Sequence, residues 1–478
     1  MEYEPVIGME VHAELSTDSK VFCGCSTKFG APPNSQVCPV CLGMPGVLPV
    51  LNKKAVEYTI RTALAMNCEI ASVVSFDRKN YYYPDLPKNY QISQNNKFFG
   101  TNGYLEIGFN GKKKRIQINN VHLEEDAGKN LHPEHPGADY SLVDLNRAGL
   151  PLIEIVSEPD MNSIAEADAY MNTLKNLLQY IEVSDCKMQE GSLRFEVNIS
   201  VRPVGEKKLG TKVEIKNLAS MRIALKCIEY EFKRQVEAIE SREKIFQETR
   251  LWDEESSVTR TMRSKEFAQD YRYFPEPDLV EVNISNEWKE QIRKSLPELQ
   301  DAKQERFIRD YEIPEYDAEI LTSSKFLADY YENAVKLCNN PKTISNWIMT
   351  ELLRELKERE IEANDFIVTP KHIAELVRLI DDGTISGKIA KQIFSETVLS
   401  GKLPSEIVKE KGLVQITDIS AIEKIVDEVL KENPEAITAI KAGKDRTIGF
   451  LVGEIMKRTK GKANPKIVND LIRKKMLG

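Results

Sequence analysis

The sequence predicts an α+β protein in which an N-terminal domain, built on a largely antiparallel sheet, precedes a helical domain and a small helical tail domain. Up to about residue 290, apolar and polar residues alternate with a period of two. This alternation is typical of strands that are covered on one face. From about 287 to 403 the chain is rich in Leu, Glu, Lys, Arg and Ala, in helix-sized segments punctuated by prolines. We place the domains at 1–290, 291–403 and 404–478.

Individual elements follow from the same patterns. The alternation is clearest at 116–119, 193–201 and 212–216, which we predict to be strands with one polar face. Helical spacing of apolar residues predicts helices at 53–67, 164–181 and 219–241. The C-terminal portion is helical too, with a turn over 461–465 between two short helices.

Length and charge limit the possible classes of protein. A chain of 478 residues is long enough for two or three domains. The net charge of −8 hides a tail, residues 441–478, that has eleven Lys and Arg against three Asp and Glu. Such a tail suggests a polyanionic partner such as nucleic acid, although a solvated helix face explains it equally well. The first residues lack the features of a signal peptide, no apolar run could span a bilayer, and four of the eight cysteines are scattered. We therefore expect a reduced, cytoplasmic protein with no membrane partner.

Four cysteines near the N-terminus form two close pairs, Cys23 with Cys25 and Cys38 with Cys41. Pairs at this spacing can direct four thiolates onto one Zn²⁺ ion. A closed site of four sulfurs leaves no open coordination position, so the ion would be structural. Four unrelated buried thiols are the alternative.

Polar residues recur on one face of several predicted strands. Glu10, His12 and Glu14 alternate with apolar neighbours on the first strand. The other members of this polar set are Arg194, Glu196 and Asn198, then Lys212, Glu214 and Lys216, and the His122–Asp126 segment with Glu124 and Glu125. Each strand alone is an ordinary solvent-facing surface. Together, carboxylates, imidazole and basic groups suit a Mg²⁺–nucleotide site. No glycine-rich phosphate loop occurs, so ATP would be held by metal ions and basic side chains on an open sheet.

Two loops combine aromatic and basic residues, at 78–88 and at 270–278. Interleaved tyrosines and cations suit stacking and phosphate contacts at a nucleotide or an RNA end. Ordinary aromatic packing beneath proline-rich loops is the alternative.

Several of these stretches closely resemble the B subunits of the tRNA-dependent amidotransferases. The matching motifs are VIGMEVH at 6–12, YPDLPK at 83–88, HLEEDAGK at 122–129, NRAGLPLIEIVSEPD at 146–160, DYRYFPEPD at 270–278 and GKANPK at 461–466. The resemblance covers essentially the whole chain. It departs from the family pattern at Glu196, where the family usually has Asp.

The resemblance implies a fold and an activity. The N-terminal cradle would be similar to the catalytic part of glutamine synthetase. The enzyme, a ligase, would use ATP to phosphorylate the side-chain carboxylate of misacylated Glu-tRNA(Gln) or Asp-tRNA(Asn). Ammonia from the glutaminase partner, the A subunit of the family, would then displace the phosphate. The small C subunit would complete the heterotrimer.

The resemblance also implies roles for particular residues. Glu10, His12, Glu124 and Glu125 would be Mg²⁺ ligands, and Glu214 a further catalytic candidate. Lys79, Lys88 and Arg194 would contact phosphate. Glu154 would hold metal or the aminoacyl amine, or equally be a paired carboxylate in a buried strand. The four cysteines match the zinc-binding members of the family. The helical domain and the basic tail would grip the tRNA. A non-catalytic RNA-binding protein is the main alternative, but it gives Glu10, His12, Glu124 and Glu125 no purpose.

Overall fold

A computed structural model describes residues 2–133, 139–264, 270–359, 366–413, 419–441, 446–459, 463 and 465–477. The chain divides into two compact units, one ending at Leu299 and the other beginning at Gln300. Most of the predicted turn at 461–465 lies outside the described residues. In the part that is described, no helix combines the length and apolar character needed to cross a bilayer.

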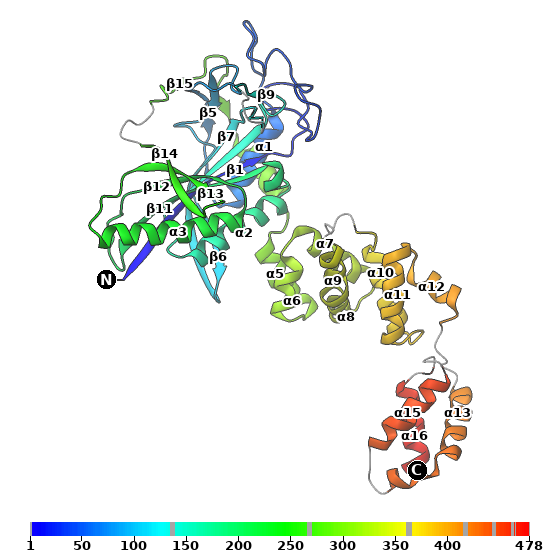
Figure 1. The fold of residues 1–478 in the computed structure, drawn as a ribbon. Helices are drawn as coiled ribbons and strands as arrows, with labels where there is room; N and C mark the ends of the chain where they lie inside the picture. Colours follow the sequence, from blue (N-terminus) through cyan, green and yellow to red (C-terminus); the bar gives the residue numbers. More distant parts are fainter. Residues whose placement is uncertain are drawn as a thin grey trace. The chain divides into compact units, whose positions relative to one another are not determined.

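A nine-stranded sheet organises the first unit (Figure 1). Its pairs are antiparallel except for one parallel pair, β12 with β13. In spatial order the strands are β14 (Val258–Ser264), β13 (Glu248–Asp253), β12 (Val213–Leu218), β11 (Leu193–Pro203), β1 (Tyr3–Glu14), β10 (Pro151–Ser157), β7 (Lys112–Glu125), β6 (Gly100–Phe109) and β2 (Glu69–Ile70). The strands predicted from alternation are confirmed as parts of β7, β11 and β12, except that Lys212 precedes β12.

Three long helices cover one face of this sheet. Each begins at a side chain that caps its first turn: Asn52 for α1 (Lys53–Ala65), Ser163 for α2 (Ile164–Tyr180) and Ser220 for α3 (Met221–Glu240). These helices confirm the three predicted ones. Their apolar sides share a core with the inward-facing residues of β1, β7, β10 and β11. Helices α2 and α3 lie side by side along the sheet (Figure 1).

Three smaller sheets complete the first unit. Strands β15 (Phe274–Pro275), β4 (Asp77–Asn80) and β5 (Tyr90–Ser93) form one of them, and β5 also contacts β7. The others pair β16 (Val282–Asn283) with β3 (Val73–Val74), and β8 (Lys129–Leu131) with β9 (Leu142–Asp144). The pairing of β15 with β4 joins the two loops rich in tyrosine, which are far apart in the sequence.

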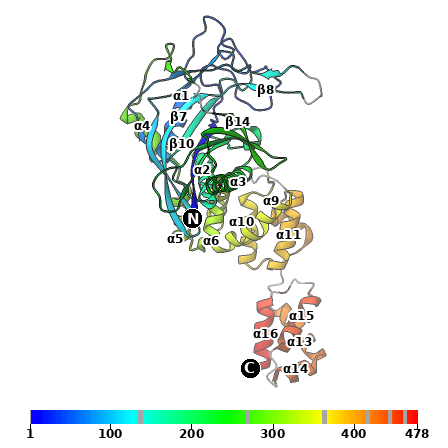
Figure 2. The ribbon, with the colours of Figure 1, turned by 60° about the vertical axis from the view of Figure 1, so that its left-hand side comes forward.

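The first unit ends nine residues after the predicted boundary at 290. The reason is α4 (Asn286–Lys294), which packs beside α1 and contributes Ile292 to the sheet core (Figure 2). In the same way, α12 (Pro404–Lys411) contributes Ile407 and Val408 to the core of the preceding helices, although the predicted tail begins at 404.

The second unit is helical and contains two separate apolar cores. The first core joins α5 (Gln300–Tyr311), α6 (Glu315–Thr322), α7 (Lys325–Leu337), α8 (Pro341–Trp347), α10 (Pro370–Asp381), α11 (Gly387–Ser400) and α12. A π-helical turn (Ile348–Leu352) links α8 to α9 (Leu353–Arg359). The second core joins α13 (Ile419–Glu432), α14 (Pro434–Lys441), α15 (Arg446–Arg458) and α16 (Pro465–Leu477).

Candidate functional site

The sheet face opposite the three helices carries a row of polar side chains across four strands. His12 on β1 lies opposite Arg194 on β11 and opposite Glu154 on β10. Glu154 in turn lies opposite His122 on β7. Because side chains at matching register share a face, the sheet itself brings together residues that are more than a hundred positions apart.

His12, Glu124 and Glu154 form the first group of ligand-type side chains. His12 Nε2 lies 3.4 Å from Glu154 Oε2 and 3.7 Å from Glu124 Oε1. His122 Nε2 is 3.2 Å from the same Glu154 oxygen, and Asn120 Oδ1 lies 2.8 Å from His122 Nδ1. Glu124 also accepts a hydrogen bond from Ser93 Oγ at 3.0 Å. One imidazole and two carboxylates therefore converge within 4.8 Å, close enough for a single divalent cation.

The charges in this first group are strongly coupled. Burial by itself would lower the pKa of His12, but the Glu154 and Glu124 carboxylates raise it to about 9. Burial opposes ionisation of Glu154, yet His122 and His12 hold the pKa of this carboxyl well below its usual range. The arrangement thus keeps an ionised carboxylate in a mostly buried position, as a cation-binding site requires.

Glu10, Glu196 and Glu214 form a second group beside the first. Their carboxylate oxygens lie within 4.8 Å of one another. Lys216 Nζ lies 2.5 Å from Glu196 Oε2 and 3.1 Å from Glu214 Oε1, so its ammonium neutralises part of the charge. Asn198 Nδ2 donates to Glu10 Oε1 at 2.9 Å. Three carboxylates are the hard oxygen ligands that Mg²⁺ prefers.

Burial and the nearby Glu154 and Glu196 carboxylates raise the pKa of Glu10. Glu10 and His12 are two residues apart on β1, which sets their Cα atoms about 6.8 Å apart. Both groups therefore lie next to each other on the same face of the sheet.

The three predicted phosphate-contacting residues have different surroundings. Arg194 Nη2 donates to Asp126 Oδ2 at 3.1 Å, and Lys88 forms an ion pair with Glu125. Lys79 has no carboxylate within ion-pair distance in the described ranges. Burial opposes its charge, but Glu124 raises its pKa, and its ammonium lies 5.1 Å from the ring centre of Tyr271.

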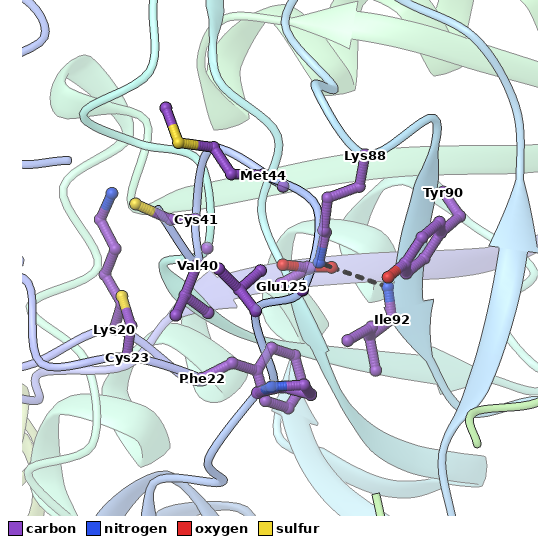
Figure 3. Close-up of a pocket in the computed structure, with 15 residues that line it drawn as sticks. Lys20, Phe22, Cys23, Val40, Cys41, Met44, Lys88, Tyr90, Ile92 and Glu125 are labelled. Atoms are coloured by element: carbon purple, nitrogen blue, oxygen red, sulfur yellow. Dashed lines mark hydrogen bonds and ion pairs between the residues drawn. The ribbon is translucent and has the colours of Figure 1, made fainter. Parts of the chain in front are cut away.

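Glu125 does not join either group of ligand-type residues. It accepts a hydrogen bond from the Ile92 backbone at 2.8 Å and lines a pocket of about 210 Å³ with Lys88, Phe22 and Cys41 (Figure 3). Consecutive residues of a strand point to opposite faces, so Glu124 and Glu125 cannot serve one ion from the same strand face.

The four cysteines predicted to bind zinc come together in the loop that follows β1. All four sulfurs lie within 4.8 Å of one another, and the Cys38 and Cys41 sulfurs are 3.9 Å apart. Four sulfurs arranged tetrahedrally at 2.3 Å from one ion would be about 3.8 Å apart. The donor set and its spacing thus fit Zn²⁺.

Sequence patterns alone do not assign several members of this site. They leave the role of Glu196 open and give Glu154 more than one possible role, yet the structure places both in ligand-type groups. They identify Lys216 and His122 only as parts of polar strands. Alternation predicts the face on which these residues lie, but the strand order that sets Lys216 against Glu196 and His122 against Glu154 depends on long-range pairing.

Comparison with known proteins agrees with the resemblance. Residues 5–290 match the GatB/GatE catalytic domain, and residues 329–476 match the GatB domain. Similar relatives are the proteins named as the B subunit of aspartyl/glutamyl-tRNA(Asn/Gln) amidotransferase from Caldanaerobacter subterraneus subsp. tengcongensis, 57% identical with 100% of both chains covered, and from Carboxydothermus hydrogenoformans, 56% identical with 99% of both covered. The protein of that name from Thermodesulfovibrio yellowstonii is 57% identical, again with 99% of both chains covered. The chain belongs to the family of aspartyl/glutamyl-tRNA(Asn/Gln) amidotransferase B subunits.

Proposed function

We propose that this chain activates and amidates the side-chain carboxylate of glutamate or aspartate esterified to tRNA(Gln) or tRNA(Asn). The activity is that of a ligase driven by ATP. One observation carries the proposal: two groups of ligand-type side chains lie side by side on the face of one sheet that the three long helices leave uncovered. A rigid sheet can hold two cations and a triphosphate in fixed positions, as phosphoryl transfer requires.

The reaction has two steps. A side-chain carboxylate oxygen attacks the γ-phosphorus of ATP, ADP leaves, and an acyl phosphate forms. Ammonia then attacks the carbonyl carbon, and inorganic phosphate leaves with the original carboxylate oxygen. Bound Mg²⁺ would neutralise charge on the β- and γ-phosphate oxygens during the first step.

The residues of the chain position and balance charge in these steps. Glu10, Glu196 and Glu214 would hold one cation, and Glu124 and Glu154 a second, together with His12 once its imidazole gives up its proton to solvent on metal binding. Among the basic residues, Lys79 is the best placed to meet a phosphate, because Glu124 faces it without forming a direct ion pair in the described part of the chain.

Three further assignments belong to this proposal. The N-terminal unit would carry a fold like the catalytic part of glutamine synthetase, which performs the same chemistry on free glutamate. The four cysteines would hold a structural zinc ion, because their donor set fits one. A glutaminase partner, the A subunit, would supply ammonia, and the small C subunit would tie the two together.

We also propose that the helical second unit holds the tRNA body. The described tail supports this only in part. Lys475 pairs with Asp427 at 2.7 Å, and Arg458 pairs with Glu432, so part of the basic charge is neutralised internally. Lys457 and Lys474 are exposed and remain candidates for backbone phosphate contacts.

Amidation assays of the chain co-expressed with its partner subunits test the proposal. Misacylated Glu-tRNA(Gln), ATP, Mg²⁺ and ammonium chloride should give ATP-dependent conversion of the attached glutamate to glutamine without free glutamine. Glu154→Gln and Glu196→Gln should lower kcat by on the order of a hundredfold or more. Tight tRNA binding without conversion, and without release of ADP, would favour the non-catalytic RNA-binding alternative.

A further inference from the structure

A cluster of tyrosines borders the first group of ligand-type side chains. Tyr81 and Tyr83 follow β4, and Tyr271 and Tyr273 precede β15. The ring centres of Tyr81 and Tyr271 are 6.1 Å apart, and this contact joins the two loops. Within the loops, the ring centres are 6.1 Å apart for Tyr81 and Tyr83, and 6.2 Å apart for Tyr271 and Tyr273. The rings meet edge to face, and Tyr83 and Tyr273, at the two ends of the cluster, are exposed.

The cluster is held rigidly and is open to solvent on one side. The Asn80 backbone donates to the Tyr271 carbonyl at 2.9 Å, and the Asn80 side chain donates to the Arg272 carbonyl at 2.8 Å. The Tyr81 hydroxyl donates to Gln91 Oε1 at 3.3 Å, and Gln91 binds the backbone of Glu125 on β7. Tyr83 is nevertheless 55% exposed and Tyr273 38% exposed.

This position next to the ligand-type side chains limits what the cluster can bind. The Lys79 ammonium lies 5.1 Å from the ring centre of Tyr271 and is close enough to Glu124 for that carboxylate to raise the lysine pKa, so the rings and the carboxylates lie on either side of one cation. In the proposed reaction, the amino acid that is activated there is esterified to the ribose of the terminal adenosine of tRNA. That adenine base must lie within the length of one nucleoside and one amino-acid side chain from the reacting carboxylate.

We propose that the Tyr81, Tyr83, Tyr271 and Tyr273 cluster stacks the 3′-terminal base of the acceptor end of tRNA. Exposed tyrosine faces beside a cation are the usual platform for an unpaired base, because every base has a π face. The adenine of ATP has the same chemistry, but we commit to the RNA terminus, because the ester bond tethers that base directly to the reacting group. This inference rests on the proposed function.

Binding measurements without turnover test the inference. The probe is an RNA hairpin that contains the acceptor stem and a terminal adenosine and carries no amino acid. It is compared with the same hairpin whose terminal base is removed. The full chain, in complex with its co-expressed partners, should bind the intact hairpin roughly tenfold more tightly. Tyr83→Leu and Tyr273→Leu should abolish this preference, and Tyr83→Trp should keep it.

Phe246→Leu is the matched control. Phe246 is exposed on the same unit and carries Lys244 at 5.0 Å from its ring centre, which reproduces the aromatic–cation pair away from the site. This variant should keep the wild-type preference for the terminal base. The KM for ATP should be unchanged in the Tyr83 and Tyr273 variants.

Three outcomes would overturn the inference. The first is that the wild-type protein binds both hairpins equally well. The second is that the leucine variants keep the preference for the terminal base. The third is that the leucine variants show a raised KM for ATP with unchanged RNA binding, which would assign the cluster to the adenine of ATP. Because binding is measured without catalysis, these results leave the amidation proposal standing. Loss of amidation with an intact base preference would count against that proposal alone.

Discussion

Replacing Lys216 by methionine should destabilise the protein and make its stability depend more strongly on a divalent cation bound by Glu10, Glu196 and Glu214. The lysine ammonium contacts Glu196 at 2.5 Å and Glu214 at 3.1 Å. Removing one partner of a buried ion pair costs about 3–5 kcal/mol. The Lys216 side chain is 32% exposed, so solvent screens part of this. We expect the free energy of unfolding to fall by about 2 kcal/mol, which lowers Tm by roughly 4 °C.

The pH of the measurement follows from the pKa of Lys216. Burial opposes its charge, but Glu196 and Glu214 raise the pKa above the ordinary value of 10.5. The folded state therefore holds the proton more tightly than the unfolded state does. The resulting stability is fully present below about pH 10 and is lost only above it. Measurement at pH 7.5 captures the whole contribution.

Thermal unfolding with and without MgCl₂ is the assay. A ligand at a hundred times its Kd stabilises the folded state by about 2.7 kcal/mol. Mg²⁺ should raise the Tm of Lys216→Met more than that of the wild type, because the ammonium no longer competes for the carboxylates. Lys233→Met is the control, since it removes an exposed helical pair with Glu229 that solvent screens, so it should leave both Tm and the Mg²⁺ effect close to those of the wild type. An equal rise in Tm with Mg²⁺ in wild type and Lys216→Met would show that the ammonium does not compete with Mg²⁺ for these carboxylates.

The other predictions concern zinc and pH. Metal analysis should find one zinc ion per chain that is lost in Cys38→Ser and kept in Cys338→Ser; a zinc-free wild type would contradict the four-sulfur site. Glu154→Gln should bring the pKa of His12 from about 9 toward 6.5 in an NMR titration. The stability that this raised pKa contributes is fully present below about pH 6.5 and is lost as the pH rises through 9. The difference in stability between the variant and the wild type should therefore be smallest above pH 9. An unchanged His12 pKa in the variant would contradict the assigned cause of the shift. Burial raises the pKa of Glu14 to about 8, which costs stability as pH rises from 4.5 to 8. In chemical denaturation, Glu14→Gln should therefore be more stable than wild type at pH 8 and equal to it near pH 4.5.

Local patterns in the sequence predicted several strands and helices and the clustering of four cysteines. Alternation over 193–201 identified the strand β11 and put Arg194 and Glu196 on its polar face, because side-chain direction in a strand follows from period alone. The four cysteines could be grouped for a similar reason: short spacing within one loop limits where the sulfurs can go.

Long-range strand pairing determines which polar side chains meet, and sequence patterns do not specify this pairing. His12 meets Glu154 and Arg194 only because β1 lies between β10 and β11, and nothing local to any of these strands specifies that order. Glu125 shows the reverse case. Strand period alone separates it from Glu124, and the structure pairs it with Lys88 instead. The first unit extends to Leu299 because α4 packs against α1, a contact that the local pattern of α4 does not indicate.

Isotope transfer tests the central claim, activation of a tRNA-bound carboxylate on the polar sheet face, most directly. Glu-tRNA(Gln) carrying ¹⁸O in the glutamate side-chain carboxylate would be converted by the co-expressed complex with ATP, Mg²⁺ and ammonium chloride, and the inorganic phosphate analysed by mass spectrometry. We expect one ¹⁸O atom in each phosphate formed, and we expect Glu196→Gln to slow the formation of both phosphate and glutamine by on the order of a hundredfold or more. Glutamine formation with unlabelled phosphate would contradict it, because the carboxylate would then never have been phosphorylated.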